Sequence, residues 1–170
     1  MSKALVLIDL EKEWQMPDSD YFLGDLSSLI EKTNQLIDYC RQQGYKIIFT
    51  VHEEKDSTKE FSAQAGRTAL LDNLNYLPED SVIKKNKISS FYQTSMDSEL
   101  KDIDTVVVVG ILTNLCVRSF VQDAYDRDLA ITIIEDCCQA MDEKIHEFTL
   151  HDLQTTREEI VIQSLADFTH

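Results

Sequence analysis

The 170-residue sequence has little of several features that mark specialised classes of protein. It contains only two prolines and four glycines, too few for a collagen-like or low-complexity chain, and 43% of its residues are hydrophobic. No apolar run approaches the roughly 20 residues that a membrane-spanning helix needs. We therefore expect one globular domain that extends over residues 1–170.

Positive charge is also scarce. The chain has 16 lysines and arginines against 31 aspartates and glutamates, which gives a formal net charge of -15. Such an acidic surface repels the phosphates of nucleic acids and the headgroups of anionic lipids, so we expect neither nucleic acid nor membrane as a partner. The opening segment MSKALVLIDLEKEW has no signal-peptide cleavage pattern, and we expect a cytoplasmic protein.

The cysteines lack the spacing of a metal site or of a redox motif. None of the four stands in a C-x-x-C pair, and all of them lie in apolar segments. Because disulfides are rare in the cytosol, we expect reduced thiols. The four residues are Cys40, Cys116, Cys137 and Cys138.

Strand-like apolar runs and helical apolar spacing alternate along the chain. Unbroken runs such as ALVLI and VVVV are typical of strands that are buried on both faces. The alternation predicts a single-domain, three-layer α/β/α fold with a mainly parallel six-stranded sheet and right-handed crossovers, a Rossmann-like arrangement. The expected strands are 4–9, 46–51, 81–85, 105–110, 130–134 and 159–163, and the expected helices are 25–43, 114–128 and 143–154.

Polar residues of different chemistry follow three of these strands. Asp9 ends the first strand, Lys84 and Lys85 end the third, and the segment Gly110–Cys116 follows the fourth. In an open parallel sheet, ligands bind in the crevice beyond the carboxyl ends of the strands. We therefore expect an acid, an amine and a thiol to meet at one edge of the sheet.

Three motifs at these strand ends resemble the isochorismatase-like cysteine hydrolases, a family that includes nicotinamidases, carbamoylsarcosine amidases and related amidases. The motifs are LIDLEKEW, KNKISSF and GILTNLCV, and the resemblance covers nearly the whole chain. It implies a hydrolase that cleaves the C–N bond of a small carboxamide or carbamoyl compound through an acyl-enzyme. By this resemblance the catalytic triad falls on Asp9, Lys85 and Cys116, and the peptide bond between Ile111 and Leu112 is cis.

The residue chemistry agrees with those roles. A cysteine in the first turn of a helix and near a lysine ammonium is expected to have a lowered pKa, which favours the nucleophilic thiolate. Asp9 can take the thiol proton and later deliver it to the departing amine, while Lys85 holds both groups in register. The backbone N–H groups of Leu112 and Cys116 would form an oxyanion hole, worth roughly 3 kcal/mol per donor.

Each of these residues also has an ordinary structural interpretation. Cys116 could be a small buried hydrophobe, and Asp9 could cap a helix. Lys84 competes with Lys85, but alternation along a strand sends the two side chains to opposite faces, and only Lys85 has the four-residue offset from Ser89. We expect Lys84 to face solvent, and we assign no function to the other three cysteines.

Two aromatic residues and one histidine bear on the substrate. Trp14 and Phe91 would be core residues on composition alone, whereas the resemblance places them near the pocket, where rings can sandwich a planar substrate. Metal-dependent nicotinamidases have an Asp-x-His pair after the second strand and another histidine downstream, and this chain offers only His52 there. Because a catalytic metal usually needs three protein ligands, we expect no metal and no other cofactor. His146 and His151 are expected to be interfacial or surface groups.

Several functions remain open on the sequence alone. A nicotinamidase-like enzyme with an atypical metal site is one alternative to a metal-independent amidase. Isochorismatase-type vinyl-ether hydrolysis is another, although members with that activity lack the cysteine found at position 116. A non-catalytic binding protein of the same fold is the third. Relatives commonly form dimers or tetramers, so we expect a homo-oligomer.

Overall fold

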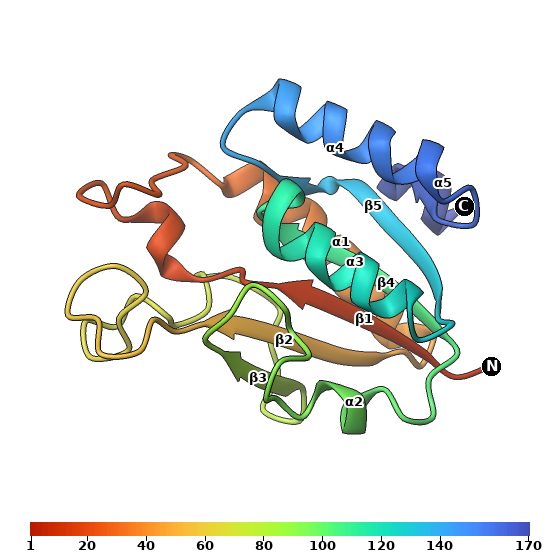
Figure 1. Cartoon of the computed structure of the whole chain (residues 1–170), viewed down its shortest axis with the longest axis horizontal. Helices are drawn as coiled ribbons and strands as arrows, with labels where there is room; N and C mark the ends of the chain where they lie inside the picture. The colour runs from red at the N-terminus through yellow and green to blue at the C-terminus, as the bar shows by residue number, and fades with distance from the viewer.

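The computed structural model describes residues 1–170 and contains one sheet of six strands that all run parallel. The strands lie in the order β3-β2-β1-β4-β5-β6 (Figure 1). They are β1 Lys3–Ile8, β2 Lys46–His52, β3 Ser81–Lys85, β4 Thr105–Ile111, β5 Ala130–Gln139 and β6 Val161–Gln163. The helical elements are η1 Lys12–Gln15, α1 Ser27–Gln42, α2 Met96–Glu99, η2 Thr113–Val117, α3 Arg118–Tyr125, α4 Glu143–Thr156 and α5 Leu165–Thr169.

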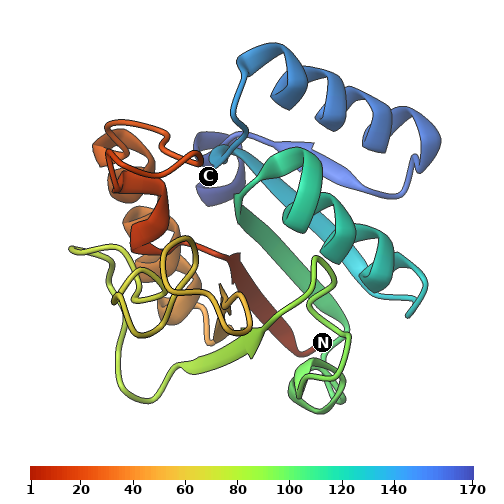
Figure 2. The same ribbon diagram turned by 60° about the vertical axis from the view of Figure 1, so that its left-hand side comes forward.

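Helices cover both faces of this sheet, which confirms the predicted three-layer α/β/α fold. Helix α1 packs on one face, where it contacts β2, β5 and α5, and α3 and α4 pack on the other (Figure 2). The central strands β1 and β4 are buried along almost their whole length, as their unbroken apolar runs predict. From β1 the chain adds β2 and β3 on one side, and it then returns to add β4, β5 and β6 on the other side of β1. Ligands of open parallel sheets usually bind in the crevice at such a point, here between β1 and β4.

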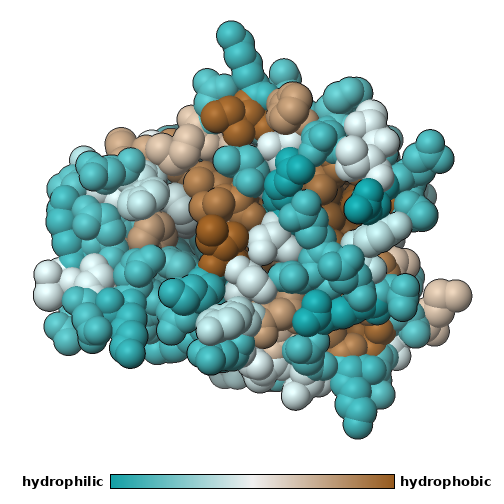
Figure 3. Space-filling model, in the orientation of Figure 1, coloured by the Kyte–Doolittle hydropathy of each residue, from teal (hydrophilic) through white to brown (hydrophobic).

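The outer surface agrees with the acidic composition. Hydrophilic residues cover most of the face seen in Figure 3, and apolar residues gather near its middle. No helix is both long enough and apolar enough to cross a membrane.

Most element boundaries differ from the predicted ones by two residues or fewer, and the larger differences are in β5 and in the expected helix 114–128. β5 continues to Gln139 instead of ending at Ile134, because its register against β4 shifts between Val108 and Gly110 and pairing then resumes. The expected helix 114–128 divides into the five-residue π-helical turn η2 and the α-helix α3, which ends at Tyr125. The short elements η1, α2 and α5 have too few residues to show a periodic pattern in the sequence.

Gly110 allows the end of β4 to approach the end of β1. It pairs with Ile8 and has a φ of 126°, in the region that favours glycine. A Cβ atom at this position would lie 2.1 Å from the carbonyl oxygen of Ile8, far inside van der Waals contact. The loop that follows β4 therefore starts directly beside the residue that follows β1.

We predict that Gly110→Ala lowers the free energy of unfolding by more than about 3 kcal/mol, because the methyl group would meet rigid backbone and the φ would be strained. Gly44→Ala is the matched control, since its φ of 75° is also positive but no atom lies within 4 Å of its Cβ position. Its cost should be only about 1 kcal/mol. Equal losses in chemical denaturation would show that close approach to β1 is not the constraint at Gly110.

Candidate active site

Asp9 follows β1 with a side chain that is fully buried. Its φ is 51°, and its backbone N–H donates to the carbonyl oxygen of Thr50 at 3.1 Å. The Thr50 hydroxyl donates to Asp9 Oδ1 at 2.6 Å, and the indole N–H of Trp14 donates to the Asp9 carbonyl oxygen, also at 2.6 Å. These contacts hold the backbone of Asp9 and one of its two carboxylate oxygens in place.

Lys85 is the last residue of β3, and its side chain has no exposed surface. Its Nζ lies 2.7 Å from Asp9 Oδ2 and 3.4 Å from Cys116 Sγ. It also donates to the carbonyl oxygen of Lys87 at 3.2 Å. The ammonium group therefore bridges the carboxylate and the thiol.

Cys116 lies in η2, which connects β4 to α3. The peptide bond between Ile111 and Leu112 at the start of this loop is cis, as the sequence resemblance implies. The N–H of Leu112 donates no hydrogen bond within the chain and is free to bind a ligand. Cys116 is 8% exposed, so its thiol lies at the floor of the site with a narrow opening to solvent.

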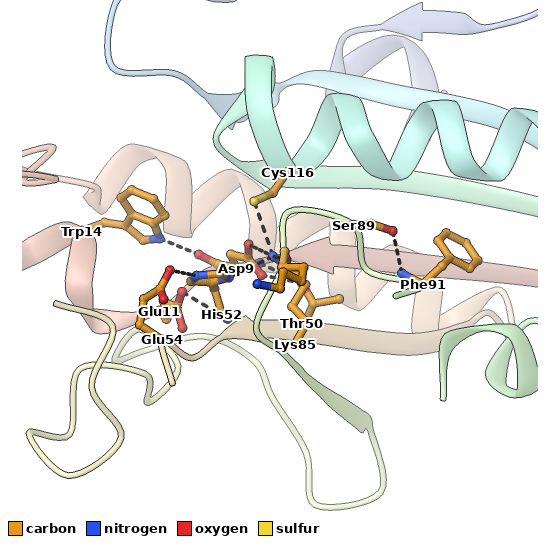
Figure 4. A network of polar contacts seen from close by, with 11 residues as sticks. Asp9, Glu11, Trp14, Thr50, His52, Glu54, Lys85, Ser89, Phe91 and Cys116 are labelled. Atoms are coloured by element: carbon orange, nitrogen blue, oxygen red, sulfur yellow. Dashed lines mark hydrogen bonds and ion pairs between the residues drawn. The ribbon is translucent and has the colours of Figure 1, made fainter. Parts of the chain in front are cut away.

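The three residues of the expected triad therefore meet at one point, although they come from three separate strand ends (Figure 4). Lys84 points outward, with 71% of its side chain exposed, and its Nζ lies 3.4 Å from Glu53 Oε2. The alternation argument thus assigned the two lysines correctly to opposite faces. The arrangement brings a carboxylate, an ammonium group and a thiol together in a buried site.

The expected lowering of the Cys116 pKa is wrong in its net direction. Burial raises the pKa of this thiol to about 12, and the charge of Asp9 raises it further, whereas Lys85 lowers it. Positive neighbours were the only influence that the sequence indicated. The resting thiol is therefore protonated at neutral pH, and it needs a base at the moment of attack.

Lys85 stays charged in spite of its burial. Desolvation lowers the pKa of this amine, but the charges of Asp9 and Cys116 act in the opposite direction, and the net pKa is raised. The Lys85 ammonium is therefore a stable positive charge beside Asp9 and Cys116.

Reasoning from the sequence missed two buried polar residues of the site, Thr50 and Glu11. Thr50 is in β2, and its contact with Asp9 depends on the register of β2 against β1. Glu11 is fully buried, and its Oε1 accepts a hydrogen bond from the backbone N–H of His52 at 3.3 Å. Burial, followed by the charge of Asp9, raises the pKa of Glu11 well above the usual 4.5. Its position two residues after Asp9 was the available signal, but glutamate is rarely buried without a partner.

The two expected substrate aromatics lie in different surroundings. Trp14 is beside the site, where it binds the Asp9 backbone and packs edge-on against Phe61 with ring centroids 5.3 Å apart. The ring of Phe91 instead stacks on Phe120 at 5.3 Å and is covered by the Arg127 guanidinium at 3.8 Å. Figure 4 shows Phe91 directed away from Cys116. Its packing is that of a core residue, and we do not carry it into the proposed substrate site.

His52 lies beside the site, and histidine is a residue type that commonly binds metal ions. Its Nε2 lies 3.1 Å from Glu54 Oε1, and its Nδ1 lies 3.5 Å from the Lys85 ammonium. No group of three or more histidine, cysteine, aspartate or glutamate side chains comes together anywhere in the chain to hold a metal ion. The ammonium would also repel a divalent cation at this position, so the residues present do not fit the metal site of the nicotinamidases.

A large cavity lies away from this site. It has a volume of about 810 Å³, lies between α1, β5 and α4, and includes none of the three residues of the expected triad. His146 and His151 line this cavity, and His146 Nδ1 lies 2.8 Å from the hydroxyl oxygen of Thr113 in η2. His146 is thus an interfacial residue between α4 and the loop that carries Cys116.

Comparisons with known proteins agree with this geometry. The profile of the isochorismatase domain matches residues 3–164. Nicotinamidase 3 of Arabidopsis thaliana is 24% identical over 165 residues, which cover 88% of this chain and 79% of that protein. A ureidoacrylate amidohydrolase of Methylobacterium radiotolerans is 37% identical over 90 residues, which cover 51% of this chain and 35% of that protein.

Solved structures show the same fold. An isochorismatase-like hydrolase from Alkaliphilus metalliredigens superposes with a TM-score of 0.87 at 20% identity, over 99% of this chain and 98% of that chain. The pyrazinamidase/nicotinamidase from Streptococcus mutans superposes with a TM-score of 0.85 at 22% identity, over 95% of this chain and all of that chain. At such identities the similarity establishes the architecture.

The opposing influences on Cys116 predict opposite effects on its alkylation. Asp9→Asn removes a charge that raises the pKa of the thiol, so labelling by iodoacetamide at about pH 8.5 should become faster, on the order of tenfold. Lys85→Met removes the charge that lowers this pKa and should slow labelling by a similar factor. Intact-mass spectrometry over time measures both rates, and Cys116→Ala identifies the labelled site. Slower labelling of the Asp9 variant would contradict this account of the thiol.

Proposed function

The chain belongs to the isochorismatase family of hydrolases, and we propose that it is a metal-independent cysteine amidase that cleaves the C–N bond of a small carboxamide or carbamoyl compound. Cys116 forms the acyl-enzyme in this proposal. The observation that carries it is the position of the Lys85 ammonium, 2.7 Å from the Asp9 carboxylate and 3.4 Å from the Cys116 sulfur in a buried site.

Acylation begins with transfer of the thiol proton from Cys116 to Asp9. Because the resting thiol is protonated, this transfer accompanies attack of Sγ on the substrate carbonyl carbon. The carbonyl oxygen becomes an oxyanion that accepts hydrogen bonds from the N–H groups of Leu112 and Cys116. When the C–N bond breaks, Asp9 returns the proton to the nitrogen, and the amine leaves while the acyl group stays on the sulfur as a thioester.

Deacylation repeats the same proton transfers with water. Asp9 takes a proton from the attacking water molecule, the C–S bond breaks, and Asp9 then protonates the departing Cys116 thiolate. Lys85 remains positively charged throughout and keeps Asp9 and Cys116 at fixed separation. Thr50 fixes the other oxygen of Asp9 and so restricts rotation of the base.

The alternatives fit these residues less well. Vinyl-ether hydrolysis of the isochorismatase type needs no nucleophilic thiol, and it leaves the contact between Lys85 and Cys116 without a purpose. A binding protein without turnover would have no need of an ion pair buried beside a thiol, an arrangement that costs desolvation energy. The nicotinamidase of Arabidopsis thaliana and the ureidoacrylate amidohydrolase of Methylobacterium radiotolerans both have names that describe amide cleavage, which supports the amidase.

Loss of each member of the triad should have a distinct effect. Cys116→Ala and Cys116→Ser should abolish turnover, and intact-mass spectrometry of the unsubstituted protein should detect an acyl adduct across a panel of small amides. Asp9→Asn should prevent acylation, and Lys85→Ala should lower turnover on the order of a thousandfold while the protein stays folded. Cys40→Ala is the matched control and should retain activity. Near-normal turnover of any triad variant would refute the assignment.

We further predict that catalysis does not depend on a metal. His52 has its two nitrogens beside Glu54 and Lys85, and it belongs to no group of three or more side chains that could hold a metal ion. Dialysis against EDTA should leave the activity unchanged, and the purified protein should hold far less than one equivalent of zinc, iron or manganese. Without an ion to bind the pyridine nitrogen, nicotinamide should not be the preferred substrate. Activity that is lost on dialysis and restored by one of these metals would disprove this prediction.

A further inference from the structure

Glu11 has a carboxyl group that is only half satisfied. The side chain has no exposed surface, and Oε1 accepts a hydrogen bond from the backbone N–H of His52. Oε2 is also buried, and it has no hydrogen-bond partner in the chain. Figure 4 shows Glu11 beside Asp9 and next to His52. Buried polar atoms of this kind are rare in native proteins, and an unpaired one beside a reactive centre indicates a place for a ligand atom.

The charges around Glu11 favour its neutral form. Asp9, after β1, raises the pKa of Glu11 more than Lys85, at the end of β3, lowers it, and the Lys85 ammonium is paired with Asp9 at 2.7 Å. Glu13 in η1 is also negative, and its partner is the Arg67 guanidinium at 3.2 Å. Arg67 belongs to the segment that pairs with residues 10–13, and its other contact is with Asp18 at 2.6 Å. No cation is left over for Glu11.

The hydrogen-bond pattern locates the proton. A neutral carboxyl group has one accepting oxygen and one O–H donor. Since Oε1 already accepts from His52, Oε2 is the oxygen that carries the hydrogen. Within the chain this donor has no acceptor.

We propose that Glu11 is a specificity-determining residue whose Oε2 hydroxyl donates a hydrogen bond to an acceptor oxygen on the acyl part of the substrate, close to the scissile carbonyl. This inference rests on the proposed amidase function. Through this hydrogen bond, Glu11 would favour small carboxamides that have a carbonyl, ureido or carboxylate oxygen a few bonds from the amide carbon. Plain aliphatic amides would leave the hydroxyl unpaired in the complex, which is costly in a buried site.

A matched pair of substrates tests the proposal. Acetoacetamide and butyramide have the same carbon chain, and only acetoacetamide carries a second carbonyl oxygen. The unsubstituted enzyme should prefer acetoacetamide by at least about tenfold in kcat/KM. Glu11→Leu should remove this preference by lowering the rate for acetoacetamide. Glu11→Gln should keep it, because the side-chain amide N–H replaces the hydroxyl as a donor.

The pH dependence supplies a second readout. Ionised Glu11 has no proton to donate, so the preference for acetoacetamide should fall as the pH rises through the raised pKa of Glu11. In Glu11→Gln the preference should not change with pH. The comparison of these two pH profiles tests the proposal even if Glu11→Leu fails to fold. Glu54→Gln is the control, because Glu54 also contacts His52 but has 54% of its side chain exposed, and it should leave the preference unchanged.

Three results would overturn the proposal: equal rates for the two amides in the unsubstituted enzyme, an unchanged preference in Glu11→Leu, or loss of the preference in Glu11→Gln. The last result would mean that Glu11 accepts a hydrogen bond or holds only a water molecule. If neither amide is cleaved, binding of both to Cys116→Ala by ligand-observed NMR separates the two proposals. Tighter binding of acetoacetamide that depends on Glu11 would support the role of Glu11 and would count only against the proposed amidase activity. Equal binding of the two amides would refute the role of Glu11.

Discussion

The ion pair between Asp9 and Lys85 is the interaction on which the rest of the site depends. Both side chains are almost completely removed from water, so either charge alone would be strongly destabilised, and each is tolerated because the other lies 2.7 Å away. The pair also sets the chemistry of its neighbours. Asp9 and burial keep the Cys116 thiol protonated at rest, and the same carboxylate, together with burial, favours a neutral Glu11. Burial is the main cause of both pKa shifts, and the charge of Asp9 adds to it at each group.

The sheet brings these residues together without help from the rest of the chain. β1 lies between β2 and β4, and β3 lies next to β2, so the ends of the three strands that carry the triad are close in space. Gly110 removes the side chain that would otherwise separate the loop after β4 from the end of β1. Thr50 reaches Asp9 because β2 pairs directly with β1. Strand order and one glycine therefore account for most of the geometry.

The sequence predicted the features that depend on local pattern. Apolar runs identified the six strands, and the alternation of Lys84 and Lys85 told which lysine faces inward. Features that depend on tertiary contact were missed. The contact of Thr50 requires the strand register, and the burial of Glu11 requires the packing of the segment 67–71 against residues 10–13. The net pKa of Cys116 needed the amount of burial, which motifs do not contain.

The protonated state of the Cys116 thiol also affects how the protein meets oxidants. Peroxides attack the thiolate and convert it to sulfenic acid, and further oxidation to sulfinic or sulfonic acid is irreversible. A thiol whose pKa is about 12 exposes almost no thiolate at neutral pH, and only 8% of the residue is open to solvent. In the proposed mechanism, the thiolate forms only when Asp9 removes the proton in the presence of a bound substrate. The cysteine of such an enzyme resists oxidation while no substrate is bound, because its thiol is protonated and buried.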